Sequence, residues 1–336
     1  MRAREGDLIE AVDGNIFDVK GLVHPPDRVI AFIRFTPDST GERMRRGTRY
    51  RKVYALRERY ELLRRKFPQY LVLDPVFNQW LCEVPVDVVK RHYEPPIYLR
   101  QLRRGGARSE LEKQALELAQ LIRTDSGVNW SALGVSGSLL VGLHTPKSDI
   151  DLIVYGSQNC RMVYNVLTSL VQDKKSYLKS YGKRDLKDLF DFRSKDTVMR
   201  FEDFVRTESR KVLQGRFHET DYYVRCVKAW SEVSETYGTA IYRSVGEAKV
   251  QATVIDDSEM IFTPCVYRID DVRVLEGTDA KPLREIVSFR GRFCEQARNG
   301  EEIMACGMVE SVETRGEKYS HLIIGSKPSD YLAPVK

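Results

Sequence analysis

Hydrophobic positions in the N-terminal part of the chain form short apolar runs that predict strands. Such runs occupy Asp7–Val12 and Ile16–Val23, with a turn at Asp13–Gly14–Asn15 between them, and Val29–Phe35 follows as a third. An Asp-Gly pair between two apolar runs is a hairpin signal. Thr40–Tyr50 is instead polar and rich in arginine, so it predicts an exposed loop.

Helical spacing follows this β-rich part. Val53–Phe67 places apolar residues at helical intervals with arginines between them, so it predicts a helix. We also expect a short helix over Val86–Tyr93 that stops at Pro95–Pro96, because a proline inside a helix removes a hydrogen bond. Arg103–Arg108 contains Gly-Gly among arginines and predicts a flexible, solvated boundary.

The middle of the chain alternates between helix and strand patterns. Ser109 is a predicted N-cap, and the pattern then predicts helices over Glu110–Arg123 and Asn159–Val171 and strands over Ala132–Val135, Ile150–Tyr155 and Tyr222–Val227. Such alternation is typical of a small mixed sheet covered by helices. From Thr239 onward, short apolar runs separated by turn residues favour a small β-barrel or sandwich.

The predicted fold class is therefore α/β (α+β). A small mixed-sheet core over residues 105–237 is flanked by a β-rich N-terminal domain with a helix over residues 1–104. A small C-terminal β-barrel or sandwich is expected over residues 238–336.

Composition agrees with a globular protein and adds little about chemistry. The chain has 336 residues, of which 42% are hydrophobic and 30% charged, and its net charge is +6. This mild basicity permits a nucleic-acid or nucleotide partner without requiring one. No apolar run approaches the roughly 20 residues that span a bilayer. We therefore expect a cytoplasmic protein with no membrane partner.

The segment GVSGSLLVGLHTPKSDIDLIVY, Gly134–Tyr155, carries the most informative chemistry. Because successive strand residues point to opposite faces, Asp149 and Asp151 share one face of the predicted strand. Two adjacent carboxylates repel each other, so a cation must neutralise them. Oxygen ligands of this kind suit Mg²⁺ or Mn²⁺.

Gly137 and Ser138 lie upstream, between a predicted strand and an apolar helical turn. Glycine lets the backbone bend tightly and approach a ligand. Free amides at a helix start bind anions, and the Ser138 hydroxyl adds a donor. A phosphate-binding turn beside a carboxylate pair suits a metal–nucleoside triphosphate.

This combination, G-S followed by D-x-D and an apolar strand, resembles the DNA polymerase β-type nucleotidyltransferase superfamily. Gly137, Ser138, Asp149 and Asp151 match its motif, and the resemblance covers residues 109–228. The whole chain also resembles an uncharacterised archaeal group of predicted nucleotidyltransferases. The resemblance implies metal-dependent transfer of a nucleoside monophosphate to a hydroxyl, with pyrophosphate leaving.

The superfamily also implies a third metal-binding carboxylate on a neighbouring strand. Asp221, at the start of TDYYVRCV, is the best candidate, which would make Asp149, Asp151 and Asp221 the catalytic metal ligands. Glu219 is a substitute on the same face. In the usual family pattern the carboxylate lies inside an apolar strand, and here Tyr223 stands at that place.

Arginines beside tyrosines suggest RNA as the acceptor, because charge and stacking together bind single strands. Arg45, Arg46 and Arg49 are the candidate RNA contacts. A protein or small-molecule acceptor stays open. Two further interpretations also remain, namely a non-catalytic RNA-binding protein that keeps the fold and a nucleotide-sensing module.

Overall fold

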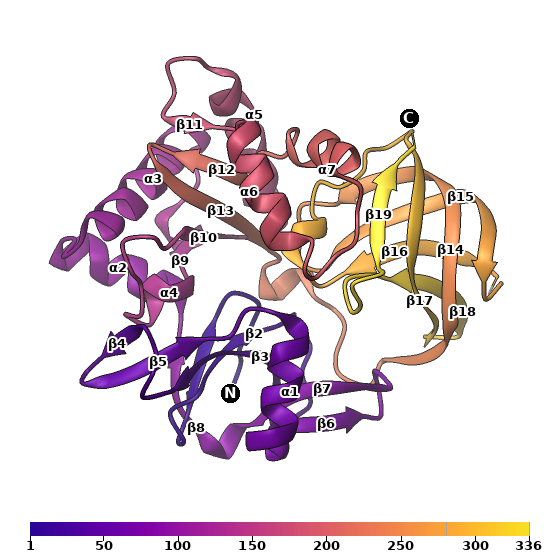
Figure 1. Cartoon of the computed structure of the whole chain (residues 1–336), viewed down its shortest axis with the longest axis horizontal. Helices are drawn as coiled ribbons and strands as arrows, with labels where there is room; N and C mark the ends of the chain where they lie inside the picture. Colours follow the sequence, from indigo (N-terminus) through magenta and orange to yellow (C-terminus); the bar gives the residue numbers. More distant parts are fainter. Residues whose placement is uncertain (280, 336) are drawn as a thin grey trace. The chain divides into compact units, whose positions relative to one another are not determined.

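The computed structural model describes residues 1–279 and 281–335, and Figure 1 labels its helices and strands. By its internal contacts the chain divides into two compact units. Unit 1 comprises Met1–Val72, Leu81–Ser180 and Val212–Ser234. Unit 2 comprises Leu73–Trp80, Tyr181–Lys211 and Glu235–Lys336. Helices and several sheets occur together, which confirms the predicted α+β class. The division into three domains stays a prediction.

The N-terminal sheet runs in the order β4-β5-β3-β2-β1-β8, and β7 pairs with both β3 and β6. Its core contains Ile9, Phe17 and Ile33, which are fully buried. The elements are β1 (Leu8–Ala11), β2 (Ile16–Val19), β3 (Arg28–Pro37), β4 (Arg43–Arg45), β5 (Thr48–Lys52), α1 (Leu56–Lys66), η1 (Pro68–Tyr70), β6 (Leu71–Asp74), β7 (Gln79–Pro85), η2 (Val86–Val88) and β8 (Val89–Tyr93).

Two predictions for this region are wrong. Thr40–Tyr50 is not a loop but contains β4 and the start of β5, which form a hairpin. Its inward contacts are made by arginines, so no apolar alternation marks it. Val86–Tyr93 is one 3₁₀ turn followed by β8, which pairs with β1. Pro95–Pro96 begins helix α2 (Pro95–Gly105) because proline is tolerated in the first helical turn.

A five-stranded sheet, in the order β11-β12-β13-β10-β9, forms the rest of unit 1. The parallel pair β10 and β13 places Asp151 opposite Tyr223. Helices α3 and α5 both pack on β10 and on each other, so they cover one face. The elements are α3 (Glu110–Ser126), η3 (Trp130–Ala132), β9 (Leu133–Val135), α4 (Gly137–Leu140), β10 (Ile150–Tyr155), α5 (Ser157–Gln172), β11 (Leu178–Lys179), β12 (Gln214–Phe217), β13 (Thr220–Val227) and η4 (Trp230–Glu232).

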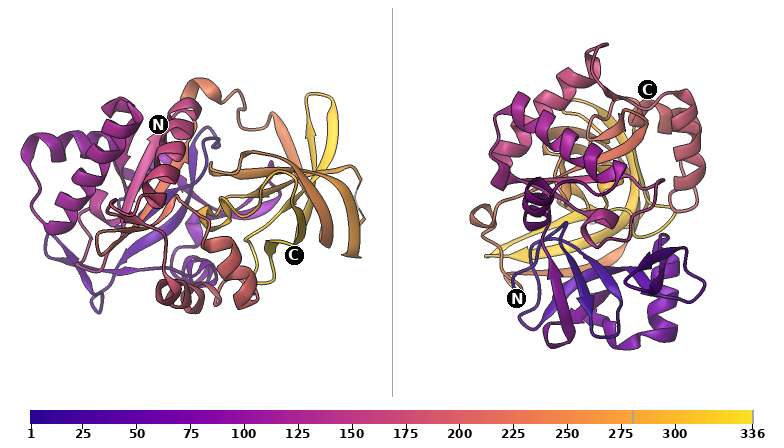
Figure 2. Two further views of the ribbon diagram at one scale, coloured as in Figure 1. Left: turned by 90° about the horizontal axis from the view of Figure 1, so that it is seen from above. Right: turned by 90° about the vertical axis from the view of Figure 1, so that its left-hand side faces the viewer.

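Unit 2 is built on a β-barrel. Strand pairing runs β14-β15-β16-β18-β17 and then from β17 back to β14, so five strands close into a ring, while β19 adds to β17. The turned views of Figure 2 show these orange and yellow strands curving strongly. The elements are α6 (Lys183–Arg193), α7 (Phe201–Glu208), β14 (Ala240–Glu259), β15 (Cys265–Gly277), β16 (Leu283–Ser288), η5 (Gly291–Phe293), β17 (Glu302–Thr314), β18 (Glu317–Ile323) and β19 (Tyr331–Pro334).

Within the described residues, none of the helices combines the length and apolarity that crossing a membrane requires.

Candidate active site

The aspartate pair lies at the start of β10, as the alternation predicts. Ile150, Leu152 and Val154 are fully buried beneath the helices, whereas Asp149 and Asp151 are only half-buried. Burial and the neighbouring Asp149 raise the pKa of Asp151 to about 6. The Asp149 carboxylate is therefore close enough to disfavour the ionisation of Asp151.

Gly137 lies directly against this pair. Its φ of +63° is in the left-handed region, and a Cβ built on it would lie 1.9 Å from Asp151 Oδ2. Only glycine therefore leaves room for the Asp151 carboxylate at this turn. Ser138 follows; its Oγ is buried and has no hydrogen-bond partner among the described residues. Helix α4 is a single turn, so the turn offers backbone and hydroxyl groups rather than a long helix dipole.

Three cationic side chains from other strands lie near enough to Asp151 to act on its charge. Arg225, Arg34 and Lys52 each oppose the rise in the pKa of Asp151 by stabilising its charged form. Lys52 is buried, and burial together with Arg34 lowers the pKa of its ammonium below the ordinary value. The negative charge of Asp149 opposes this lowering of the pKa, so Lys52 interacts electrostatically with Asp149 as well as with Asp151. The cationic side chains would attract the phosphates of a nucleotide, and the carboxylates would attract a metal cation.

Arg225 forms ion pairs with carboxylates of the N-terminal segment. It forms an ion pair with the fully buried Glu5 and lies 3.9 Å from Asp18. Burial would lower the pKa of Arg225, but Glu5 and Asp18 raise it above its ordinary value. Lys20 Nζ lies 3.0 Å from Glu5 and 2.9 Å from Asp18, which completes the network. Arg225 is therefore a fixed charge beside Asp151.

The three arginines proposed to contact RNA differ in their surroundings. Arg45 is mostly buried and donates to Glu10 Oε2 at 2.7 Å, to Tyr93 Oη and to Val141 O. It therefore fixes the β4–β5 hairpin to the loop after α4. Arg46 and Arg49 are exposed, and Arg49 donates to Gly41 O at 3.1 Å. Only these two present their charge to solvent.

Asp221 is not assembled with the aspartate pair. Its side chain is 50% exposed at the start of β13 and lies 3.6 Å from Arg216 Nε. Glu219, the substitute, is exposed in the turn before β13. Within residues 1–279 and 281–335, no group of three His, Cys, Asp or Glu side chains is placed to hold a metal ion. The metal-binding role of Asp221 stays a prediction.

The residues present fit one hard divalent cation better than two. Asp149 and Asp151 offer carboxylate oxygens, and Ser138, which follows Gly137, has a buried Oγ without a hydrogen-bond partner among the described residues. The absent Cβ of Gly137 keeps the approach to Asp151 open. Since no third carboxylate is placed among the described residues, positive charge from Arg225, Arg34 and Lys52 would have to neutralise the remaining phosphate charge.

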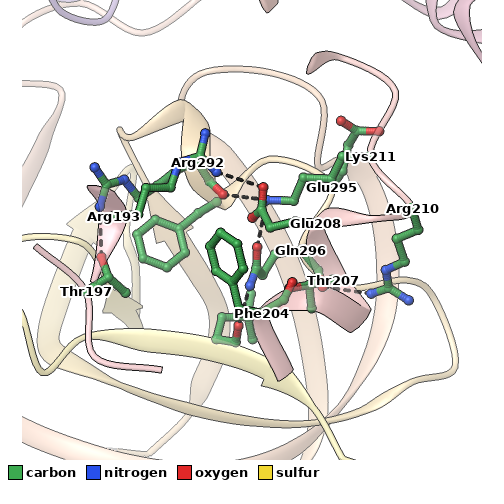
Figure 3. Close-up of polar contacts among 12 residues, drawn as sticks. Arg193, Thr197, Phe204, Thr207, Glu208, Arg210, Lys211, Arg292, Glu295 and Gln296 are labelled. Carbon is green, nitrogen blue, oxygen red and sulfur yellow. Dashed lines mark hydrogen bonds and ion pairs between the residues drawn. The ribbon is translucent and has the colours of Figure 1, made fainter. Parts of the chain in front are cut away.

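Unit 2 contains a second charged cluster, around Glu208 and Lys211 (Figure 3). Lys211 Nζ donates to Glu208 Oε1 at 2.7 Å, to Gln296 Oε1 at 2.9 Å and to Arg292 O at 2.6 Å. Arg193 donates to the other Glu208 oxygen at 2.7 Å. A small cavity with phenylalanine walls adjoins these side chains. Because Lys211 and Glu208 bond to each other and to neighbours, this cluster is structural.

Sequence reasoning found the aspartates but not all of their neighbours. Arg34 and Lys52 are separated from the motif by many residues and reach it only through the β3 and β5 pairing. No local pattern distinguishes them from other arginines and lysines on strands. Arg225 offers a weak signal, because it shares a strand face with Asp221 in the sequence pattern.

Comparison with known proteins gives a relative but no activity. The chain is 32% identical over 336 residues to the uncharacterized protein MJ1086 of Methanocaldococcus jannaschii, an alignment that covers 97% of this chain and 96% of that protein. No family model matches the chain. No solved structure matches it either.

Proposed function

This chain belongs to the same family as MJ1086 of Methanocaldococcus jannaschii, and we propose that it is a metal-dependent nucleotidyltransferase. It moves a nucleoside monophosphate from a nucleoside triphosphate to a hydroxyl acceptor on RNA. The observation that carries this proposal is the contact between Gly137 and Asp151. This contact supports the proposal because a glycine turn lies directly against the carboxylate pair, which is the arrangement that the resemblance to the superfamily implies.

The residues divide the reaction between them. Asp149 and Asp151 would hold Mg²⁺ or Mn²⁺, which when bound supplies charge neutralisation at the reacting phosphate. The turn at Gly137 and Ser138 binds and orients the triphosphate through backbone amides and the buried hydroxyl. Positioning of this kind accounts for most catalysis in phosphoryl transfer.

The cations complete the charge balance. Arg34, Lys52 and Arg225 face the carboxylate pair and attract the negative triphosphate into it. The acceptor hydroxyl oxygen forms a bond to the α-phosphorus, the bond from that phosphorus to the bridging oxygen breaks, and pyrophosphate leaves with the electron pair. The hydroxyl proton passes to solvent.

The experiment is transfer of label from each α-labelled nucleoside triphosphate to total cellular RNA, with Mg²⁺ or Mn²⁺ present. We expect label in RNA with the natural protein and none with Asp149→Asn or Asp151→Asn. Asp221→Asn is the matched variant, because its half-exposed side chain lies beside Arg216. Full activity of Asp221→Asn supports a site completed by cations, and its loss supports a carboxylate triad.

A second candidate function is non-catalytic nucleotide or RNA binding on the same fold. It is favoured by one observation, the lack of a third metal-binding side chain beside the pair among the described residues. Nucleotide binding that depends on Asp149, together with no label in RNA, protein or small acceptors, would decide for this candidate.

A further inference from the structure

Tyr54 lies at the end of the strand that brings Lys52 to the aspartates. One residue, Val53, separates it from the end of β5, and 42% of the residue is exposed. Lys52 Nζ lies 4.5 Å from the centroid of its ring, and Arg34 Cζ lies 5.6 Å from it. An aromatic ring with substantial solvent exposure therefore lies beside two of the three cations that face Asp151.

The order of these groups matches the order of parts in a nucleotide. Asp149 and Lys52 interact through charge, and Lys52 in turn contacts Tyr54. If Lys52 and Arg34 bind the phosphates, the sugar and then the base of the nucleotide would follow in the direction of Tyr54. An exposed aromatic ring at that place offers a face on which a base stacks. A core role explains the tyrosine poorly, because core tyrosines such as Tyr50 and Tyr222 are almost fully buried.

We propose that Tyr54 stacks on the base of the bound nucleoside triphosphate and that this site binds nucleotides through base and phosphates together. The inference rests on the proposed nucleotide site. Stacking needs only an aromatic face, so it accepts all four bases. The ligand class is therefore any nucleoside triphosphate.

The test compares ligands with and without a base. We would measure dissociation constants by calorimetry in Mg²⁺ for the four nucleoside triphosphates and for inorganic tripolyphosphate. Tyr54→Leu removes the ring and keeps apolar bulk, Tyr54→Ala removes both, and Tyr54→Phe keeps the ring. Tyr177→Ala is the matched control, because Tyr177 is also exposed but its ring lies 4.4 Å from that of His218 in a tilted contact. Thermal unfolding checks that each variant folds.

We expect Tyr54→Leu and Tyr54→Ala to weaken every nucleoside triphosphate roughly ten-fold and to leave tripolyphosphate unchanged. Tyr54→Phe and Tyr177→Ala should bind as the natural protein does. Equal weakening of tripolyphosphate, or no weakening of the nucleotides, overturns the stacking role. If the natural protein binds tripolyphosphate as tightly as nucleotides, this inference alone fails. If it binds neither ligand, the proposed function fails with it.

Discussion

In unit 2, the Lys211 ammonium donates three hydrogen bonds to neighbouring oxygens, and both Glu208 carboxylate oxygens accept a bond from a cation. In unit 1, the Asp149 and Asp151 carboxylates accept no hydrogen bond from the described residues, although three cations lie around them. In the first cluster the charged groups are hydrogen-bonded to one another and to neighbouring residues. In the second, the carboxylate oxygens are available to bind a ligand. Buried charge alone therefore does not indicate a functional site; incomplete pairing does.

The largest expected effect comes from breaking the hydrogen-bonded cluster of unit 2. Lys211→Met should lower the free energy of unfolding by about 3–5 kcal/mol, because it leaves the buried Glu208 with half of its compensation. Chemical denaturation measures this change. Lys187→Met is the control, since the exposed Lys187–Asp191 pair is worth about 0.5 kcal/mol. Similar stabilities of the two variants would show that the cluster is not structural.

Removing a charge from the aspartate pair should instead raise the free energy of unfolding. The pKa of Asp151 is raised from 3.8 to about 6 in the folded protein. Its ionisation therefore destabilises the metal-free fold progressively as pH rises through this window. Asp151→Asn does not titrate, so its stability relative to the natural protein should rise between pH 4 and 7 by about 1–3 kcal/mol.

Urea unfolding in EDTA at several pH values measures this difference. Asp125→Asn, which changes an exposed aspartate of α3, should give a difference that does not vary with pH. An Asp151→Asn variant that is less stable than the natural protein at pH 7 would contradict the view that the pair is under-compensated.

Two glycines with left-handed backbones sharpen the comparison further. Gly127 has φ +71° and open space where a Cβ would lie, with no atom within 4 Å, whereas a Cβ on Gly137 would meet Asp151. Both alanine variants should lose about 1 kcal/mol of stability from backbone strain. Only Gly137→Ala should also weaken nucleotide binding in a titration. Loss of binding in Gly127→Ala would mean that backbone strain, and not the Asp151 contact, controls the site.

The smallest effect is expected at the hairpin arginines. Reversing the charge of Arg46 and Arg49 should weaken RNA binding equally for all sequences and reduce the salt dependence of the affinity by about one unit per lost phosphate contact. Stability should stay within about 0.5 kcal/mol. Arg45→Ala should instead destabilise the fold, because Arg45 bonds to Glu10, Tyr93 and Val141. RNA binding that changes neither with salt concentration nor with the charge reversals at Arg46 and Arg49 would contradict the proposal that RNA is the acceptor.

Local pattern was enough to predict the parts of the molecule that depend on nearby residues. Strand β10 has the predicted bounds, and Ser109 caps α3 with a reciprocal bond to Glu112. Gly137 meets Asp151 because its turn follows β9, which pairs with β10 so that Val135 lies opposite Leu152. For β10 and the α3 cap, alternation or capping chemistry within a few residues determines the outcome.

Long-range pairing set the limits of prediction. The β4–β5 hairpin buries Arg43 against Leu143 O, so its sequence resembles a solvated loop. β8 is a strand because β1 pairs with it, although Val86–Tyr93 has a helical appearance. The cations beside Asp151 come from β3, β5 and β13, and only the folded sheets bring them to one place.

The chain passes between the two units at five junctions, after residues 72, 80, 180, 211 and 234. Residues 73–80 therefore leave the ribosome long before residues 235–336, with which they cluster. At a synthesis rate of about 5–20 residues per second, unit 2 waits many seconds for its last strands. Translation that stops early would release a nascent chain without the barrel strands, so residues 73–80 and 181–211 would lack the segment with which they cluster.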